Sequence, residues 1–438
     1  MPQASCLAPA PASASAREIW SWACFDFANS GYTTVVMTTI YSAYFVAVIA
    51  GAADLAEGVG TLLWTLAVAL ANLVVLVTGP VLGALADRRA CKKRLLLGTT
   101  VGCVLATAAL GLVGPGQVLP AMSLVVLSAI AFASGENLIA AFLPEIAPPA
   151  RLGRISGYGW SLGYAGGLLT LGCCLAYISW AAAHGQPAEH YVPVTLLITA
   201  AIFAVAATPT FLWLRERARP VAEPGGAHYL WGALRRVVDT LRHASRLPDL
   251  FRFLCCLTLY QAGVATVVVI AAIYAQEVMG FDSQQLIVLV MVVNFTAALG
   301  AFGFGHAQDR FGSVRSLAAG LGVWLVAIAA AWCADRAAHI WLAGNLIGLA
   351  MGATQAGGRA LIARLTPVSR SGEIFGLWGV ANRAAAIIGP LAYGAISGLS
   401  GGDHRLAMLS TGGFFLAGLI LLATVDESRG RATALVAR

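Results

Sequence analysis

The sequence contains very little charge. Charged residues make up 11% of its 438 positions and hydrophobic residues make up 59%, whereas a soluble domain carries about 25% charged residues. A water-soluble surface cannot be covered with so few charges, so the excess apolar surface must face lipid. One membrane-spanning helix needs about 20 apolar residues, and a chain of this length has room for roughly a dozen of them.

Several patterns that mark enzymes and soluble binding proteins are also missing. The nine cysteines form no Cys-x-x-Cys pair and no cluster with histidine, which argues against a metal site or a disulfide framework. The glycine-rich stretches at 157–167 and 348–358 precede no Gly-Lys-Ser/Thr, so they indicate close helix contacts rather than an ATP site. The net charge of +7 lacks the interleaved aromatic residues of a nucleic-acid surface. We therefore expect no cofactor, no metal and no nucleic-acid partner.

What the sequence does contain is a series of long apolar runs. They predict twelve transmembrane helices, over residues 19–50, 61–85, 95–113, 118–143, 155–180, 192–214, 251–278, 285–304, 314–333, 340–365, 374–399 and 406–425. We expect an all-α membrane protein with a six-helix bundle at 18–214, a cytoplasmic linker at 215–249, a second six-helix bundle at 250–427, and cytoplasmic tails at 1–17 (disordered) and 428–438. Within the linker, residues 229–243 predict an amphipathic helix on the membrane surface, with a partner-docking helix as the alternative.

Positive charge alternates between the predicted loops. Arginine and lysine are concentrated after the second, fourth, eighth and tenth runs, in the central segment and in the C-terminal tail, whereas the other loops contain only Arg336 and Arg405. Because positive residues are retained on the cytoplasmic side, both termini are expected to be cytoplasmic. We expect a monomeric integral protein of the inner, cytoplasmic membrane.

The two halves of the chain repeat the same features. A Gly-x-x-x-Asp pattern followed by arginine occurs after the second and the eighth runs, as Gly83, Asp87, Arg88 and as Gly305, Asp309, Arg310. Such a repeat predicts two parallel six-helix bundles, the arrangement of major facilitator transporters, which rock around a site at the membrane midplane. Glycine lets helices approach closely, and an aspartate at a helix end can pair with an arginine or a helix N-terminus. We interpret both segments as gating latches, with fixation of topology alone as the alternative.

Further segments resemble a known family. Residues 22–30, 142–146, 154–167, 355–367 and 373–378 are similar to the vacuole effluxer-like family of the major facilitator superfamily, which includes fungal vacuolar exporters of amino acids. The resemblance implies a central cavity lined by the first, fourth, seventh and tenth helices, and export of an amino acid or a related metabolite. The chain departs from the family at 261–263, where an acidic residue is usual, and at 139–141, where Tyr-Asn is usual.

Polar residues inside the apolar runs are the candidate site. A charge at the bilayer centre costs about 2.5–3.5 kcal/mol on insertion scales, so such residues face a cavity or a partner. The candidates are Asp26, Asn29, Glu136, Asn137, Gln261, Gln355, Arg359, Asn382 and Arg383, with Tyr32, Trp160 and Tyr164 as aromatic residues that either shape the pocket or only pack.

One pair of candidates follows from the repeat. Glu136 and Arg359 lie at equivalent distances before Pro144 and Pro367, so we predict that they face each other across the cavity. Arg359 would hold a substrate carboxylate or another anion, because its side chain keeps its charge. Glu136 or Asp26 would carry a coupling proton. The alternative is a static ion pair that ties the bundles together.

The leading functional hypothesis is a secondary active transporter that exports an amino acid or a related metabolite with proton coupling. An exporter of amphipathic or toxic compounds is the first alternative, and an apolar cavity in which Arg359 is not exposed would favour it. A receptor or scaffold that keeps the fold without moving solute is the second, but the paired latch segments argue against it. An enzyme is not expected, because no nucleophile–base set occurs. The expected partners are a small-molecule substrate, the lipid bilayer and protons.

Overall fold

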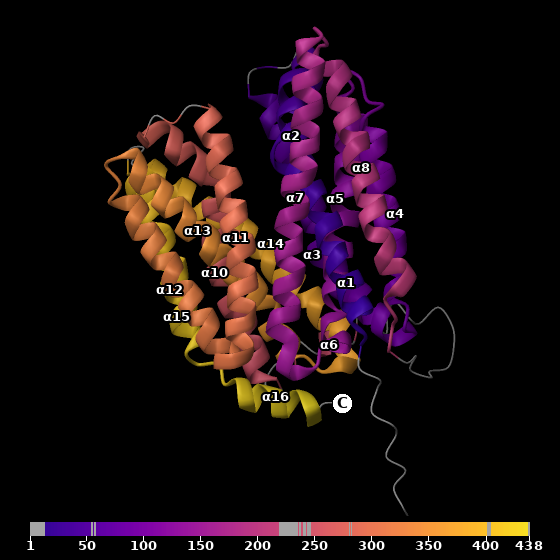
Figure 1. The fold of residues 1–438 in the computed structure, drawn as a ribbon, viewed down its shortest axis with the longest axis vertical. Coiled ribbons are helices and arrows are strands. Elements are labelled where there is room, and N and C mark those ends of the chain that lie inside the picture. Colours follow the sequence, from indigo (N-terminus) through magenta and orange to yellow (C-terminus); the bar gives the residue numbers. More distant parts are fainter. Residues whose placement is uncertain are drawn as a thin grey trace, which may run out of the picture.

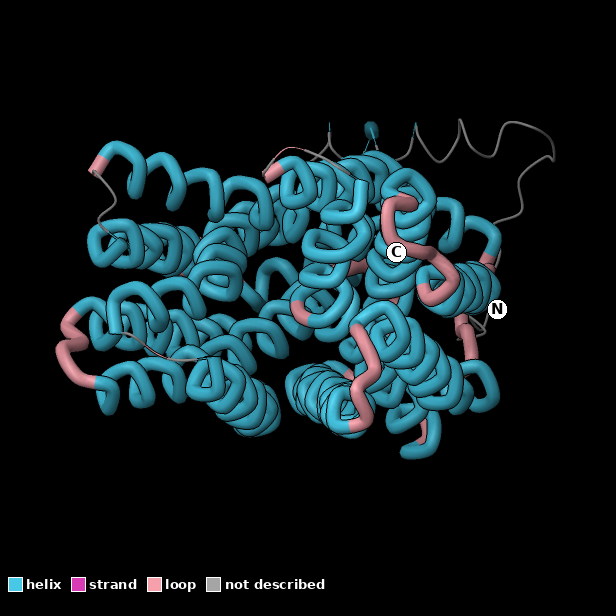
Figure 2. Tube along the Cα trace, turned by 90° about the horizontal axis from the view of Figure 1, so that it is seen from above, coloured by secondary structure: helices cyan, strands magenta, loops and turns pink. Residues whose placement is uncertain are grey.

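The protein is described here from a computed structural model that covers residues 14–436, except 54–55, 57, 219–234, 236–237, 240–241, 243–246, 280, 282 and 401–403. Within that part of the chain all regular elements are helices, joined mostly by short connections (Figure 2). The amphipathic helix predicted at 229–243 lies largely outside the described residues.

The first half contains six long helical segments. The first begins at a capping box formed by Ser15 and Glu18, in which each residue satisfies the other's backbone N–H. The segments are α1 (Ala16–Tyr32), extended through Thr33–Thr38, α2 (Ile40–Tyr44) and Phe45–Ala50 to Ala53; α3 (Val59–Arg89); α4 (Lys92–Leu110); α5 (Val118–Ala140), followed by the short α6 (Leu143–Ile146); α7 (Leu152–Ala183); and α8 (Ala188–Trp213).

The second half has a matching set of helices. They are α10 (Pro248–Met279), α11 (Ser283–Phe311), α12 (Ser313–Trp332), α13 (Ala337–Leu365), α14 (Ser371–Leu399), α15 (His404–Leu422) and α16 (Glu427–Val436). In the described residues, eleven helices are long and apolar enough to cross a membrane, or twelve if α15 and α16, bent by 64°, form one span. The predicted all-α membrane fold is confirmed.

Helix α3 shows how the sequence divides between lipid and protein. Leu62, Leu66 and Leu73 recur at helical spacing and are at least half exposed, whereas Ala67 and Ala71 between them are buried. An exposed stripe of large apolar side chains is stable only against lipid, and the small residues on the other face let neighbouring helices approach closely.

The two halves meet at one end of the molecule. We call it the basic end, because Arg88, Lys92, Arg154, Arg310 and Arg370 lie there. In Figure 1 the halves converge at this end, which carries α6 and α16, and they diverge toward the other. The contacts are backbone to backbone, since a Cβ at Gly83 would collide with the carbonyl of Gly372. Glycine at these positions holds α3 against α14.

The same close approach occurs between α7 and α11. A Cβ added at Gly153 would lie 2.5 Å from the carbonyl oxygen of Gly305. Helices α3 and α11 also run further than predicted, to Arg89 and Phe311, so Asp87 and Asp309 lie in last helical turns rather than in loops. The apolar runs end before the helices do, because these last turns pack against protein and not against lipid.

Candidate functional site

Four charged residues meet between the two halves. Asp26 on α1 and Glu136 on α5 belong to the first half, and Arg359 on α13 and Arg383 on α14 belong to the second. Nη1 of Arg359 lies 2.7 Å from Oδ2 of Asp26, and Nη2 of Arg383 lies 3.1 Å from Oε2 of Glu136. Asp26 and Arg359 are also near enough to Glu136 to interact with it electrostatically. Both ion pairs of this four-charge cluster therefore cross the interface between the halves.

The partners differ from those predicted. The structure pairs Arg359 with Asp26 rather than with Glu136, whose partner is Arg383. Repeat symmetry places Glu136 and Arg359 at equivalent depths, but it does not fix which charge of the other half lies nearest. The prediction that Arg359 holds an anion must therefore be weighed against what already surrounds it.

Arg359 is enclosed on all sides. Its Nε donates to Oγ of Ser156 at 3.2 Å, and its Nη2 donates to the Ser156 carbonyl at 2.9 Å. The guanidinium carbon lies 4.7 Å from the ring centroid of Trp22 and 5.3 Å from that of Trp160, within the range of cation–π attraction. Each nitrogen of the guanidinium thus has a protein partner, and the side chain is only 4% exposed.

The space for this pair is provided by Gly159 on α7. A Cβ at Gly159 would lie 2.5 Å from Nη2 of Arg359 and would collide with the carboxylate of Asp26. Sequence reasoning missed Gly159, Ser156 and Trp22 as parts of the site. The glycine-rich stretch at 157–167 contains Gly159 and begins one residue after Ser156, but its composition by itself indicates only helix packing.

The second ion pair is more open. Arg383 and Glu136 are 20% and 29% exposed, and Nη1 of Arg383 approaches Oδ1 of Asn72 on α3 at 3.4 Å. Among the described residues, Nε of Arg383 has no hydrogen-bond partner. This pair therefore retains an unused donor, whereas in the Asp26–Arg359 pair the atom without a hydrogen bond is an acceptor, Oδ2 of Asp26.

Three amide side chains of the second half, Gln261, Gln355 and Asn382, form a hydrogen-bonded amide cluster. Nε2 of Gln261 donates to Oε1 of Gln355 at 3.0 Å and to Oδ1 of Asn382 at 2.7 Å. Oε1 of Gln261 and Oδ1 of Asn29 are buried acceptors without a partner in the described part of the chain. The structure thus joins three of the predicted polar residues directly and leaves acceptors available.

Four predicted residues lie outside the two ion pairs and the amide cluster. Tyr32 is fully buried in the first half, where its hydroxyl is 2.8 Å from that of Ser128. Asn137 packs against Gly379 between the halves and borders a small hollow at the basic end. Trp160 and Tyr164 contact each other with ring centroids 5.9 Å apart. Trp160 also lies against the guanidinium of Arg359, and Tyr164 is near enough to Arg359 to interact with it electrostatically.

The first latch is built around Asp87. Its carboxylate accepts the backbone N–H groups of Gly372 and Glu373, both at 2.9 Å, at the N-terminus of α14. A carboxylate at this position is favoured by the helix dipole. The fully buried Lys92 lies beside it, with Nζ 3.1 Å from Asp87, 2.5 Å from Glu145 and 2.6 Å from Oγ of Ser371. Lys92, counted in the sequence as a loop cation, is therefore part of the contact between halves.

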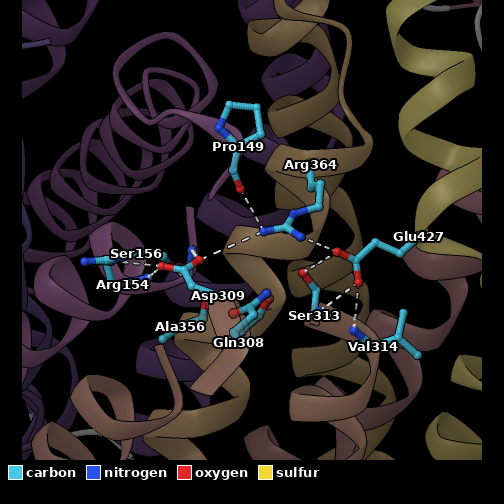
Figure 3. Close-up of polar contacts among 12 residues, drawn as sticks. Pro149, Arg154, Ser156, Gln308, Asp309, Ser313, Val314, Ala356, Arg364 and Glu427 are labelled. Atoms are coloured by element: carbon cyan, nitrogen blue, oxygen red, sulfur yellow. Dashed lines mark hydrogen bonds and ion pairs between the residues drawn. The ribbon is translucent and has the colours of Figure 1, made fainter. Parts of the chain in front are cut away.

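The second latch is built around Asp309. It accepts the N–H groups of Gly153 at 2.8 Å and Arg154 at 3.1 Å, at the N-terminus of α7. Figure 3 shows Arg364 between Asp309, the carbonyl of Pro149 and Glu427. The motif arginine Arg310 lies over the ring of Phe311 instead. The cations beside Asp309 are Arg154, with Nε 3.2 Å away, and Arg364, with Nη2 4.0 Å away.

Two further carboxylates cap helices, one in each half. Glu216, after α8, accepts the N–H groups of Lys92 and Lys93 at the start of α4. Glu427, after α15, accepts those of Ser313 and Val314 at the start of α12. The repeat thus extends to these caps, which the sequence prediction missed because the two surrounding segments differ. No group of three or more His, Cys, Asp or Glu residues that could hold a metal occurs in the described ranges.

The fold and the cluster define the class of protein. The structure superimposes on that of the major facilitator superfamily proton:xylose symporter XylE with a TM-score of 0.70 and 15% identity, covering 96% of this chain and 98% of the other. That identity supports the fold alone. The chain has the major facilitator fold.

The family follows from the sequence. The chain belongs to the vacuole effluxer Atg22-like family, whose model matches residues 61–435. It is 27% identical over 410 residues to the uncharacterized MFS-type transporter YxiO of Bacillus subtilis (strain 168), covering 93% of this chain and 94% of that protein. It is 24% identical over 299 residues to autophagy-related protein 22-1 of Penicillium rubens, covering 64% of this chain but only 50% of the fungal protein.

Proposed function

We propose that this protein is a secondary active transporter that exports an amino acid or a related small metabolite, with protons as the coupling ion. The observation that carries the proposal is the four-charge cluster between the halves, both of whose ion pairs must separate when the halves rock. Charges are kept at such depth in a membrane where they serve a solute or ion pathway. The family's description as vacuole effluxers supports export.

The basic end would face the cytoplasm, because positive residues are retained there. With both latches engaged at that end, this state would be closed to the cytoplasm. Both termini would then be cytoplasmic, and the membrane would be the inner, cytoplasmic one. We propose a monomer as the transporting unit, since the alternating halves lie within one chain.

Opening to the cytoplasm requires that both latches and both ion pairs separate. Separating a buried ion pair is costly, because each charge is left without a partner. Protonation of Asp26 would remove one of those charges and so lower the cost of separating α1 from α13. A proton taken up from one side and released on the other would thereby couple solute movement to the pH gradient.

The test is transport by the purified full-length protein in proteoliposomes. The vesicles are preloaded with a mixture of radiolabelled amino acids, and efflux is followed with and without an imposed pH gradient. We expect efflux of one or more amino acids, faster with the gradient, and none from vesicles that contain the Asp26→Asn and Arg359→Ala variants. Equal efflux from empty and protein-containing vesicles for every compound would contradict the proposal.

The alternatives predict different results in the same assay. An exporter of amphipathic compounds would move lipophilic dyes but not amino acids, and a receptor or scaffold would move neither. The charged and amide residues of the cluster favour a polar solute over an amphipathic one, because apolar cargo would leave these groups without hydrogen-bond partners.

A further inference from the structure

We infer that the Glu136–Arg383 pair, together with Asn72, is the solute-binding site, and that it selects a zwitterion whose carboxylate binds Arg383 and whose ammonium binds Glu136. The Asp26–Arg359 pair is then a contact that holds the halves together and not a ligand site. This inference rests on the proposed transport function and assigns its substrate class to particular side chains.

Arg359 is unsuited to a ligand in this state. Its three nitrogens already have partners in Asp26 and Ser156, and its faces lie against Trp22 and Trp160. A solute carboxylate would have to displace these contacts, all of which come from the opposite half. Binding there would therefore require the halves to separate first.

Arg383 presents the features that Arg359 lacks. Its Nε is a buried atom without a partner in the described part of the chain, and it lies on the same edge of the guanidinium as Nη2, which contacts Glu136. That edge can hold a carboxylate through two parallel hydrogen bonds. Because exposing a charge to lipid is costly, the partial exposure of Arg383 and Glu136 is best explained by a water-accessible path.

Charge balance determines what can bind. An anion that took Glu136's place on Arg383 would leave the Glu136 carboxylate without its partner, and a cation bound to Glu136 would do the same to Arg383. Each case leaves a partly buried charge unpaired, which is strongly unfavourable. A zwitterion with adjacent ammonium and carboxylate groups satisfies both side chains at once. Gln261 on α10, whose Oε1 has no partner in the described part of the chain, donates to Asn382, the residue before Arg383.

Binding of this kind would also loosen the interface between the halves. Glu136 lies on α5 and Arg383 on α14, so an inserted zwitterion replaces a direct contact between halves by a bridged one. The solute would thereby favour separation of α5 from α14, while the Asp26–Arg359 pair still holds α1 against α13. Binding of the solute would weaken the contact between α5 and α14, and separation of the Asp26–Arg359 pair would then allow the two halves to rock apart.

The inference is tested by equilibrium binding to the purified, full-length protein. Each of the common radiolabelled amino acids is screened, and the tightest binder is compared with its amide, which is a cation only, and with its deaminated acid, which is an anion only. We expect both analogues, and the Arg383→Lys and Glu136→Gln variants, to weaken binding by about tenfold or more, the size expected for loss of a charged hydrogen bond. The Arg359→Lys variant should slow transport while changing the dissociation constant by much less.

A charge-swapped double variant, Glu136→Arg with Arg383→Glu, keeps an ion pair and serves as the folding control. It should remain monodisperse and yet bind the amino acid weakly. Wild-type affinity in both Arg383→Lys and Glu136→Gln, equal affinity for the deaminated acid, or no amino acid bound by the wild type would each overturn the inference. Amino acid transport that is insensitive to these variants would overturn the binding site but leave the proposed function standing. Amino acid binding that depends on these residues, without any transport, would overturn the proposed function but leave the binding site standing.

Discussion

The two ion pairs between the halves contain the same chemical groups but have different surroundings. Asp26–Arg359 is enclosed by Ser156 and two tryptophan rings, whereas Glu136–Arg383 is partly exposed and retains an unused donor. A buried pair whose guanidinium nitrogens all have partners can only hold or release, while a pair with an unpartnered guanidinium nitrogen can exchange its partner for a ligand. We propose that the unused donor of a charged pair, and not its residue types, indicates its role.

The largest expected effect comes from removing Arg359. In Arg359→Ala the carboxylate of Asp26 loses its partner while buried, which costs about 3–5 kcal/mol for a buried pair. We expect the melting temperature in detergent to fall clearly and transport to be lost. In the double variant Asp26→Asn with Arg359→Gln, stability should largely return but transport should not. Transport by Arg359→Ala at the wild-type rate would remove the basis for the comparison between the pairs.

The next test changes the enclosed pair without altering its charges. Gly159→Ala introduces a Cβ where Asp26 and Arg359 meet, so the pair must shift or separate. We expect transport to fall at least as far as in the conservative variant Arg359→Lys, whereas the affinity for the solute should change much less. Gly172→Ala on the same helix is the matched control, since open space surrounds that position. Normal transport by Gly159→Ala would show that the geometry of the pair is not important.

The latches offer a second comparison, in which a smaller effect is expected. Asp87 contacts a fully buried lysine at 3.1 Å, whereas the nearest cation to Asp309, Arg154, is 38% exposed and the more buried Arg364 lies 4.0 Å away. Screening by water weakens an exposed ion pair, so Asp87→Asn should open the basic end more than Asp309→Asn. Spin-label distances between α3 and α14, and between α7 and α11, measure the populations of the closed and open states of each latch. Equal shifts in both variants would mean that the helix N-termini, and not the lysine, dominate each latch.

The smallest effect is expected at the caps within each half. Glu427→Gln removes a charge from the N-terminus of α12 and from Arg364, and such a cap contributes about 1 kcal/mol. We expect a modest fall in melting temperature with transport retained. Thr433→Ala, on the exposed face of α16, should change neither quantity. Loss of transport in Glu427→Gln would assign α16 a part in gating.

The sequence by itself determined the membrane helices, the repeat and most of the polar residues in the cluster. These follow from local properties, since an apolar run of sufficient length must span lipid and a charge inside it must be sheltered. It did not determine the ends of α3 and α11, because the last turns pack against protein. The sequence also could not show that Tyr32 packs within the first half while Trp160 contacts Arg359.

Only the tertiary structure decided which charges pair. Asp26 and Arg359, or Lys92 and Ser371, are far apart in the chain, and their contact depends on how two bundles dock. Glycine at 83, 159 and 372 permits that docking, but a sequence gives no sign of which helix a glycine faces. Pairing across an interface is set by distances of a few ångströms, whereas the cost of burying a charge depends mainly on the residue type. The sequence therefore identified the charged residues, and the fold assigned their partners.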